Sequence, residues 1–372
     1  MTRRIILLGI FCQAFFASAS RHVEQSFYIP SDLQNRTSYT VFESLASGLD
    51  GPKVQPINAT TFDWWYFDVV STNPADLSTA VVTFFSTPPS AFPFLTPSND
   101  ITVAVLWISY LNGSLWSTAS YADGATVKVD GDYTSGTWNN SGFSWTSTES
   151  GYLIEIDAPD AGVTGTIGFK TVAPPHYPCG PAEAGQNLEL GPHIGWANAI
   201  SDADSTVDLH IDGNTRFAFK GTGYHDKNWS DVTFGTHIAS WYWGRGRLGP
   251  YSLVWWDVLS RTGAETFSAY AAKDNKILAA SCAPGSIKAR PIGQNSTYPP
   301  VLSTGNPSGY RVELDLGPDG KLELDLTVLA PLIALNPEYA RFVGNMSGSI
   351  TCGKHTEKLT GMALFEQFKL TE

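Results

Sequence analysis

The feature that constrains this chain most is a series of short segments in which apolar and polar residues alternate, separated by glycine and proline. "ITVAVLWISY", "GYLIEIDA", "YRVELDL" and "KLELDLTVL" are examples. Period-two alternation between turn residues is typical of antiparallel β-strands. No helix-period run of useful length competes, apart from a possible turn near "NPEYARFV". The sequence therefore predicts an all-β protein.

The length of the chain predicts more than one β unit. Its 372 residues exceed the size at which a single core usually stops growing. The proline-rich stretch "VAPPHYPCGPAEAGQN" predicts a surface loop, with a domain change after it. We expect an N-terminal β domain over 20–235 and a C-terminal β domain over 236–372, packed side by side as barrels or sandwiches.

The N-terminus is typical of a secretory signal. Arg3 and Arg4 precede an apolar run from Ile5 to Phe16, and small residues follow. This layout predicts a signal peptide over 1–19 that is cleaved after Ala19, and it suits a buried first strand less well. We therefore expect a secreted or vesicular protein, and no later segment is long and apolar enough to predict a membrane span.

Entry into the secretory pathway predicts glycosylation and a disulfide. The predicted glycosylation sites lie in Asn-x-Ser/Thr triplets at Asn35, Asn58, Asn112, Asn139, Asn295 and Asn345. A further triplet at Asn228 lies in a dense aromatic and charged motif, where an enzyme would reach it less easily. Three cysteines remain after the signal, and we expect Cys282 to pair with Cys352 while Cys179 is buried.

Charge and motifs exclude several function classes. A net charge of -12 argues against nucleic acid and anionic lipid as partners. The histidines and cysteines show neither HExxH nor Cys-x-x-Cys spacing, so we expect no metal. There is likewise no G-x-S-x-G elbow, phosphate loop or dinucleotide fingerprint. With 13% aromatic residues, the chain is suited to an aromatic-lined cavity.

Two aromatic segments predict strands whose faces differ. In "FDWWYFD", alternation places Asp63, Trp65 and Phe67 on one face and Trp64, Tyr66 and Asp68 on the other. In the predicted hairpin "ASWYWGRGRLGPYSLVWWDVL", alternation likewise separates Tyr242 from a face shared by Trp241, Trp243 and Arg245, with Trp256 on the returning strand. These rings could pack a barrel wall or border a cavity.

The stretch "GTGYHDKNWSD" concentrates chemistry in a few positions. Asp226 can fix the tautomer of His225, while Lys227 and Asn228 supply hydrogen-bond donors. This cluster could be a catalytic site. It could also be a buried polar corner that joins the two domains, because clustered polar groups often satisfy one another.

The chain resembles the carotenoid 1,2-hydratase-like proteins and the fungal lipocalin-like Diels-Alderases. The resemblance rests on Asp63-Trp64-Trp65-Tyr66, on the segment from Gly221 to Trp229, on "SWYWGR" and on "GMALFEQF" with Glu366. It departs from many members at Asp63, where they carry Glu, and at Ser230, where they carry Gly. The resemblance implies two lipocalin-like antiparallel β domains, each a barrel or sandwich, with a pocket between them.

The resemblance also implies a function. We expect a cofactor-independent pericyclase that performs a Diels-Alder cycloaddition on small apolar polyene or terpenoid and polyketide-derived substrates. Its secreted hetero-Diels-Alderase branch joins a tropolone quinone methide to a humulene-type sesquiterpene. The alternatives are a decalin-forming intramolecular Diels-Alderase, a terpenoid or carotenoid hydratase, and a secreted lipocalin-like carrier without catalysis.

The residues in these motifs give the expected site. His225 or Lys227 would donate a hydrogen bond to the substrate, and Asp226 and Asn228 would orient them. The expected substrate-binding residues are Asp63, Trp64, Trp65, Tyr66, Tyr224, Trp229, Trp241, Trp243, Trp256 and Glu366.

Overall fold

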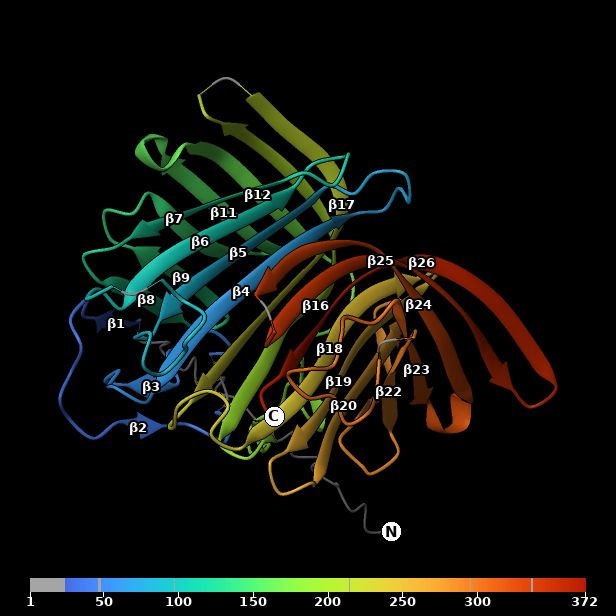
Figure 1. Ribbon diagram of the computed structural model, residues 1–372. Coiled ribbons are helices and arrows are strands. Elements are labelled where there is room, and N and C mark those ends of the chain that lie inside the picture. Colours follow the sequence, from blue (N-terminus) through green and yellow to red (C-terminus); the bar gives the residue numbers. More distant parts are fainter. Residues whose placement is uncertain (1–23, 46–47, 97, 214, 295, 336) are drawn as a thin grey trace, which may run out of the picture.

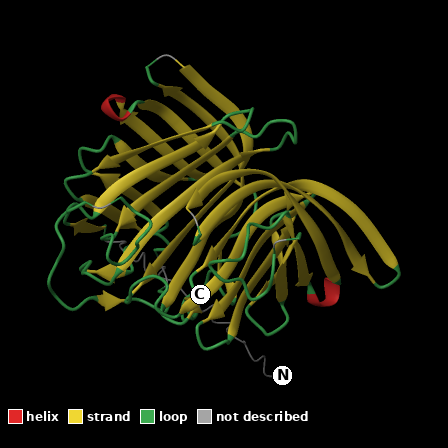
Figure 2. Ribbon diagram, in the orientation of Figure 1, coloured by secondary structure: helices red, strands yellow, loops and turns green. Residues whose placement is uncertain are grey.

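Two large curled antiparallel sheets make up the protein (Figures 1 and 2). The computed structural model describes residues 24–45, 48–96, 98–213, 215–294, 296–335 and 337–372, so the predicted signal peptide over 1–19 lies outside the described residues. Within these ranges helix is limited to two short 3₁₀ turns, η1 (Pro159–Ala161) and η2 (Gly317–Asp319). The predicted all-β, lipocalin-like fold class is confirmed.

The first sheet has the strand order β1-β8-β9-β10-β11-β12-β16-β17-β4-β5-β6-β7. Its strands are β1 (Gln25–Ile29), β4 (Phe62–Ser71), β5 (Thr79–Ser86), β6 (Thr102–Ser109), β7 (Leu115–Tyr121), β8 (Ala125–Asp130), β9 (Tyr133–Trp138), β10 (Phe143–Thr148), β11 (Gly151–Ala158), β12 (Val163–Thr171), β16 (Ile194–Ile211) and β17 (Thr215–Ser230). Beside it lie β13 (His176–Tyr177), β14 (Gly180–Pro181) and β15 (Glu189–Gly191), and β2 (Tyr39–Thr40) pairs with β3 (Val54–Gln55).

The second sheet has the order β21-β20-β19-β18-β26-β25-β24-β23-β22. Its strands are β18 (Ile238–Leu248), β19 (Tyr251–Ser260), β20 (Glu265–Lys273), β21 (Lys276–Ser281), β22 (Ile287–Ile292), β23 (Gly309–Asp315), β24 (Lys321–Leu335), β25 (Tyr339–Cys352) and β26 (His355–Lys369). The chain therefore passes from one sheet to the other between Ser230 and Ile238. The domain limits given above remain predictions.

Burial along the strands shows where the two sheets meet. Every residue of β4 is buried, whereas the edge strand β7 alternates between exposed and half-buried residues. β16 is buried on both faces over residues 194–203 and alternates beyond them, and β17 is buried on both faces from residue 222 onward. These stretches face β18, β25 and β26 of the second sheet in Figure 1, and β4 contacts β26 while β17 contacts β18. A strand covered on both faces has two apolar sides.

Three apolar clusters follow from this arrangement, one inside each curled sheet and one between the sheets. Trp65 and Phe67 belong to the cluster inside the first sheet, whereas Trp64 and Tyr66 belong to the cluster between the sheets. Trp241, Trp243 and Trp256 join that middle cluster, and Tyr242 and Trp255 lie inside the second sheet. The predicted alternation in both aromatic segments is confirmed.

Buried charges join the two sheets at one end of the middle cluster. The Arg245 guanidinium on β18 pairs with the Asp68 carboxylate on β4, and it donates to the Thr222 hydroxyl at 2.8 Å. Beside this pair, Arg247 donates to Asp202 on β16 at 2.7 Å. These contacts reach from one sheet to the other, so they fix the spacing between the sheets at this end.

The disulfide prediction is wrong, because Cys179 pairs with Cys282 and Cys352 is an exposed free thiol. The proline-rich segment folds against the second sheet, where Ser268 on β20 donates to the Pro178 carbonyl. This packing brings Cys179 beside the end of β21, with the two Cα atoms 4.6 Å apart. Cys352 is the last residue of β25, just before the turn to β26.

The predicted glycosylation sites differ in accessibility. Asn35 and Asn112 are exposed, Asn58, Asn139 and Asn345 are half-buried, and Asn295 lies outside the described residues. Asn228 is only 4% exposed, so its triplet is closed to a glycan in the folded protein. Occupancy of the other sites stays a prediction.

Candidate active site

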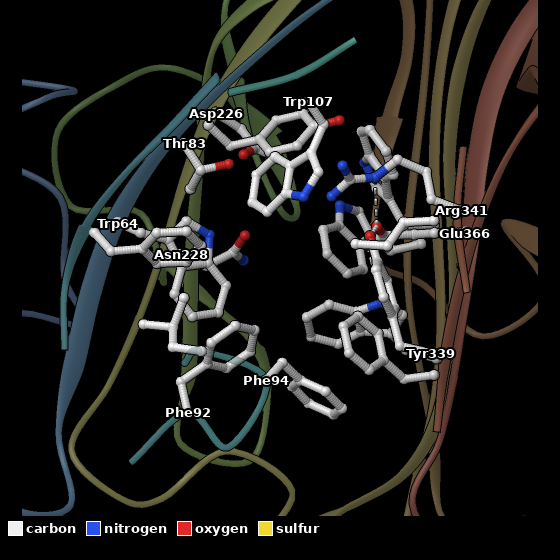
Figure 3. A pocket seen from close by; sticks show the side chains of 18 residues that line it. Trp64, Thr83, Phe92, Phe94, Trp107, Asp226, Asn228, Tyr339, Arg341 and Glu366 are labelled. Atoms are coloured by element: carbon white, nitrogen blue, oxygen red, sulfur yellow. Dashed lines mark hydrogen bonds and ion pairs between the residues drawn. The ribbon is translucent and has the colours of Figure 1, made fainter. Parts of the chain in front are cut away.

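A cavity lies in the middle cluster, between the two sheets (Figure 3). About 660 Å³ of space lies between its lining side chains, and part of that space is open to solvent. The first sheet and the segment after β5 contribute Trp64, Tyr66, Thr83, Phe85, Phe92, Phe94, Leu95, Trp107, Asp226 and Asn228. The second sheet contributes Trp241, Trp243, Trp256, Ile333, Tyr339, Arg341, Glu366 and Phe368.

Asp226 is the carboxyl group of the first-sheet wall. Its Oδ2 accepts hydrogen bonds from the Tyr224 hydroxyl at 2.7 Å and from the Trp196 indole Nε1 at 2.8 Å. Among the described residues Oδ1 has no hydrogen-bond partner. Because two donors occupy Oδ2, a proton on this carboxyl group belongs on Oδ1.

The environment of Asp226 keeps that proton in place. Burial raises the pKa of the Asp226 carboxyl to about 8, against the two hydrogen bonds, which lower it. The nearby carboxylates of Glu366 and Asp68 raise it further. Asp226 is therefore a neutral carboxylic acid at neutral pH, the form that can donate a proton into an apolar cavity.

Replacing Tyr224 with Phe is expected to move the pH dependence of activity. The hydroxyl stabilises the ionised form of Asp226, so its loss raises the pKa further and should shift the alkaline limb of kcat upward by about one pH unit or more. The plateau should fall, because Oδ2 can then compete for the proton. A pH–rate profile checks this, and an unchanged alkaline limb would contradict the orientation of the proton argued above.

Arg341 and Glu366 form the opposite, charged wall of the cavity (Figure 3). Glu366 Oε2 accepts from the Tyr339 hydroxyl and from Arg341 Nε at 3.4 Å, and Oε1 accepts from Trp241 Nε1 at 3.2 Å. Burial raises the pKa of Glu366, and the Arg341 charge opposes that shift. With Nε held by Glu366, the terminal nitrogens of Arg341 have no hydrogen-bond partner among the described residues and can donate to a substrate oxygen.

Asn228 and Thr83 add neutral polar groups beside Asp226. The Asn228 amide nitrogen makes a long contact of 3.4 Å to the Gly195 carbonyl, and its oxygen has no partner among the described residues. Figure 3 shows the Thr83 hydroxyl and the Asn228 amide on the same side of the cavity as Asp226. The site thus combines aromatic walls with an acid on one side and a cation on the other.

His225 does not line this cavity, which contradicts its predicted role as a donor to a substrate held there. Side chains alternate along β17, so His225 points into the cluster inside the first sheet and stacks on Phe67 with ring centroids 3.7 Å apart. Its Nδ1 lies 2.9 Å from the Tyr66 carbonyl and its Nε2 lies 3.0 Å from Asp50 Oδ1. His225 holds the loop that carries Asp50 against β17 and β4.

Lys227 also points away from the cavity, so its predicted donor role fails for the same reason. Its ammonium pairs with the buried Asp63 carboxylate and lies 3.9 Å from the centroid of the Trp65 ring. Trp229 belongs to the same apolar cluster. Asp63, Trp65 and Trp229 are therefore core residues, and the predicted substrate-binding role of these three is wrong for this cavity.

Lys227→Met is expected to destabilise the fold without changing any side chain that lines the cavity. Removing one member of a buried ion pair leaves Asp63 without its charge partner, at a cost of about 3 to 5 kcal/mol in the free energy of unfolding. The loss should shrink at acidic pH, where Asp63, whose pKa is raised by burial, can protonate. Urea unfolding of Lys227→Met and of Lys227→Met/Asp63→Asn tests this. Equal losses in the two variants would contradict it.

The sequence interpretation missed several cavity residues. Tyr339 and Arg341 begin β25, in the stretch interpreted as a possible helical turn, although their spacing of two residues fits one face of a strand. Phe92, Phe94 and Leu95 lie in the loop after β5, where no strand period marks them. Trp196, which supports Asp226 from behind the cavity wall, lies on β16 opposite Asn228 and donates from its indole to Asp226.

Among the described residues, no group of three or more His, Cys, Asp or Glu side chains is placed to hold a metal ion. In the same ranges, no helix is long and apolar enough to cross a membrane.

The comparisons with known proteins agree on one family. A family profile described as Diels-Alderase-like matches residues 32–288. The quinolone epoxide rearrangement protein asqO of Emericella nidulans is 35% identical over 98% of both chains. The Diels-Alderase poxQ of Penicillium oxalicum is 28% identical over 71% of this chain and 60% of its own. The crystal structure of CghA with Sch210972 matches with a TM-score of 0.73 and 20% identity, over 94% of this chain and 99% of CghA, which shows a shared fold.

Proposed function

We propose, from the premise that this chain belongs to the Diels-Alderase-like family, that it rearranges an epoxide of the quinolone class by proton donation from Asp226. The family is one of pericyclase-type enzymes, and the reaction proposed for this chain uses the same kind of cavity for an acid-catalysed rearrangement. The substrate class is suggested by the relative that matches over nearly the whole chain, which is named a quinolone epoxide rearrangement protein. The observation that carries the proposal is a neutral carboxylic acid, Asp226, facing an aromatic cavity.

The proposed reaction needs one acid that later acts as a base. Asp226 Oδ1 donates its proton to the epoxide oxygen, and a C–O bond breaks to leave a carbocation on the adjacent carbon. A substituent then migrates to that carbon with its electron pair, which creates a protonated carbonyl group. The proton returns from the carbonyl oxygen to Asp226, so the product is an isomer of the substrate and the carboxyl group is restored.

The aromatic wall suits a cationic intermediate. The indole rings of Trp64, Trp243 and Trp256 line the cavity, and the face of an indole attracts a positive charge by about 0.5 to 2 kcal/mol. Apolar walls also exclude water, which would otherwise add to the cation and give a diol. The hydratase alternative requires such a water, whereas the rearrangement requires its exclusion.

A second candidate function is cycloaddition, and Arg341 favours it. Its terminal nitrogens, together with the Asn228 amide, can polarise a carbonyl on a dienophile, while the cavity holds the two reacting ends together. The hetero-cycloaddition of a tropolone quinone methide with a humulene-type sesquiterpene and the decalin-forming reaction both belong to this class. Both stay predictions.

A product assay tests the rearrangement against the hydratase and carrier alternatives. The protein is incubated with a quinolone epoxide, and the products are analysed by liquid chromatography and mass spectrometry. The proposal expects a new isomer of unchanged mass, formed faster than in buffer. A product heavier by one water would indicate a hydratase. Binding without turnover would indicate a carrier, and either outcome would overturn the proposal.

We also propose that the protein follows the secretory route. The Cys179–Cys282 disulfide supports this, because such bonds form and persist in oxidising compartments. Mass spectrometry of protein recovered from culture medium, before and after glycan removal, tests the route. Recovery of unglycosylated protein that retains residues 1–19 would contradict it.

A further inference from the structure

A second concave region lies at the surface beside the cavity, and we call it the outer groove. It encloses about 900 Å³, much of it open to solvent. It is lined by Pro93, Phe94, Phe234, Gly235, Arg261, Leu302, Glu338 and Leu370. The lining is mainly apolar. Nothing in the reaction argued above uses it.

The Phe94 ring separates the outer groove from the cavity, because Phe94 is the residue common to both linings. The ring is half-buried, and its centroid lies 5.1 Å from that of Phe92 and 5.3 Å from that of Phe368. Figure 3 shows Phe94 at the edge of the cavity, beside Phe92 and on the side away from Asp226. One side chain therefore lies between the cavity and the outer groove, at the end of the cavity opposite the acid.

Phe94 is held by side-chain packing and does not belong to a strand. The segment after β5 makes a turn at Pro88, whose carbonyl accepts from the backbone N–H groups of Ala91 and Phe92. The Phe234 N–H donates to the Ala91 carbonyl and ties this turn to the segment that joins the two sheets. Phe94 thus occupies a position where a change of side chain should not disturb a sheet.

Charged residues lie around the apolar lining of the outer groove. Arg261 donates from Nε to the Gly235 carbonyl and from Nη2 to the Leu370 carbonyl, so its guanidinium is held by the backbone. Glu338 is half-buried. Pro93, Leu302 and Leu370 supply the apolar surface between them, which suits a hydrocarbon chain better than a second polar ring.

We propose that the outer groove binds an apolar chain, alkyl or isoprenyl, attached to the ring system held in the cavity, and that Phe94 determines how long a chain the protein accepts. The position of the ring system rests on the proposed function. The inference adds a substrate class, a polar bicyclic head with an extended hydrocarbon tail, and a specificity-determining residue.

A homologous series of ligands tests the outer groove by binding alone. The probes are 4-quinolones with methyl, pentyl and nonyl chains at carbon 2, and the quenching of tryptophan fluorescence reports their binding to the full-length protein. Each methylene that enters the groove should tighten binding by about fourfold. Leu302→Trp, which fills the groove, should abolish the gain for the nonyl homologue and leave the methyl homologue unchanged. In Phe94→Ala, the tightening of binding with each added methylene should continue to chains longer than those that the wild-type protein accepts.

The control variant is Leu111→Trp, at an exposed leucine in the turn between β6 and β7, which should change none of the affinities. If Leu302→Trp weakens the binding of all homologues equally, or of none, the proposal that the outer groove binds the apolar chain is contradicted. If the nonyl homologue binds in a Leu302-dependent way but no quinolone epoxide is turned over, the groove stands and the proposed function fails. If no homologue binds, both fail.

Discussion

Asp226→Asn is expected to reduce kcat by about 10²- to 10⁴-fold, the usual contribution of a positioned general acid. The amide keeps the shape of the side chain, and its oxygen can accept the same two hydrogen bonds from Tyr224 and Trp196. What it loses is the acidic proton. KM should change little, because the cavity walls remain. A steady-state comparison with the wild-type protein measures the effect, and a variant that retains activity would exclude Asp226 as the acid.

The pH dependence of kcat, measured for wild type and for Asp226→Asn, shows whether the neutral or the ionised form of Asp226 is the active one. The pKa of Asp226 is raised to about 8, so its neutral, donating form predominates below that pH and is lost as the pH rises through it. Wild-type kcat should therefore be highest below about pH 8 and fall above it, while the residual activity of Asp226→Asn should lack this limb. A wild-type profile that rises above pH 8 would indicate that the ionised form is the active one.

The free energy of unfolding should also depend on pH differently in wild type and in Asp226→Asn. A carboxyl group whose pKa is higher in the folded state than its ordinary 3.8 binds a proton more tightly when folded. Wild-type stability should therefore decline as the pH rises from about 4 to about 8, and Asp226→Asn should lack this part of the decline. Urea unfolding across that range tests the burial of the acid independently of any substrate.

For the cycloaddition, the second candidate function, Arg341→Met is expected to lower kcat by about 10²- to 10³-fold, the loss typical of a donor aimed at developing negative charge. Methionine keeps much of the apolar length of the side chain and removes the terminal N–H groups. Glu366 would keep its hydrogen bonds from Tyr339 and Trp241, and its raised pKa would let it become neutral. The cavity should therefore survive the substitution.

The matched control is Arg341→Met/Glu366→Gln, which removes the charge of both partners. If Arg341 acts on the substrate, the double variant should be as inactive as the single variant while unfolding at a higher urea concentration. If the single variant fails only because Glu366 is left uncompensated, the double variant should regain activity. That result would contradict a donor role for Arg341.

The sequence predicted the fold and the aromatic walls because these depend on local pattern. Alternation in the strand around Trp64 and in the hairpin around Trp243 is visible in the chain itself, and it places these rings on the cavity side. The same rule correctly separates Asp226 and Asn228 from His225 and Lys227. Local pattern could not say which of these two faces would be covered by the second sheet.

That choice depends on tertiary packing. The pairing of β17 with β4 places Asp226 opposite Tyr66 and His225 opposite Phe67. The register between strands far apart in the sequence therefore decides which face of β17 meets the cavity and which meets the core of the first sheet. His225 and Lys227 suggest a catalytic role in the sequence because such side chains titrate and donate readily, yet in the fold they pair with Asp50 and Asp63 inside the first sheet. The acid that faces the cavity gains its reactivity from burial, which the sequence does not display.

The disulfide was also beyond local pattern. Cys179 and Cys282 are 103 residues apart, and they meet because the proline-rich segment crosses to the second sheet. Arg341 was missed for a similar reason, since only the order of β25 beside β26 brings it to Glu366. Both cases depend on where a segment docks, and neighbouring residues do not encode that position.

The infrared spectrum of Asp226 in the ligand-free protein tests the central claim most directly. The difference spectrum between wild type and Asp226→Asn should contain the carbonyl stretch of a neutral carboxyl group at neutral pH, and this band should give way to carboxylate bands as the pH passes through about 8. A carboxylate signal already present at neutral pH, with no neutral carboxyl band, would contradict the assignment of Asp226 as the acid of this site.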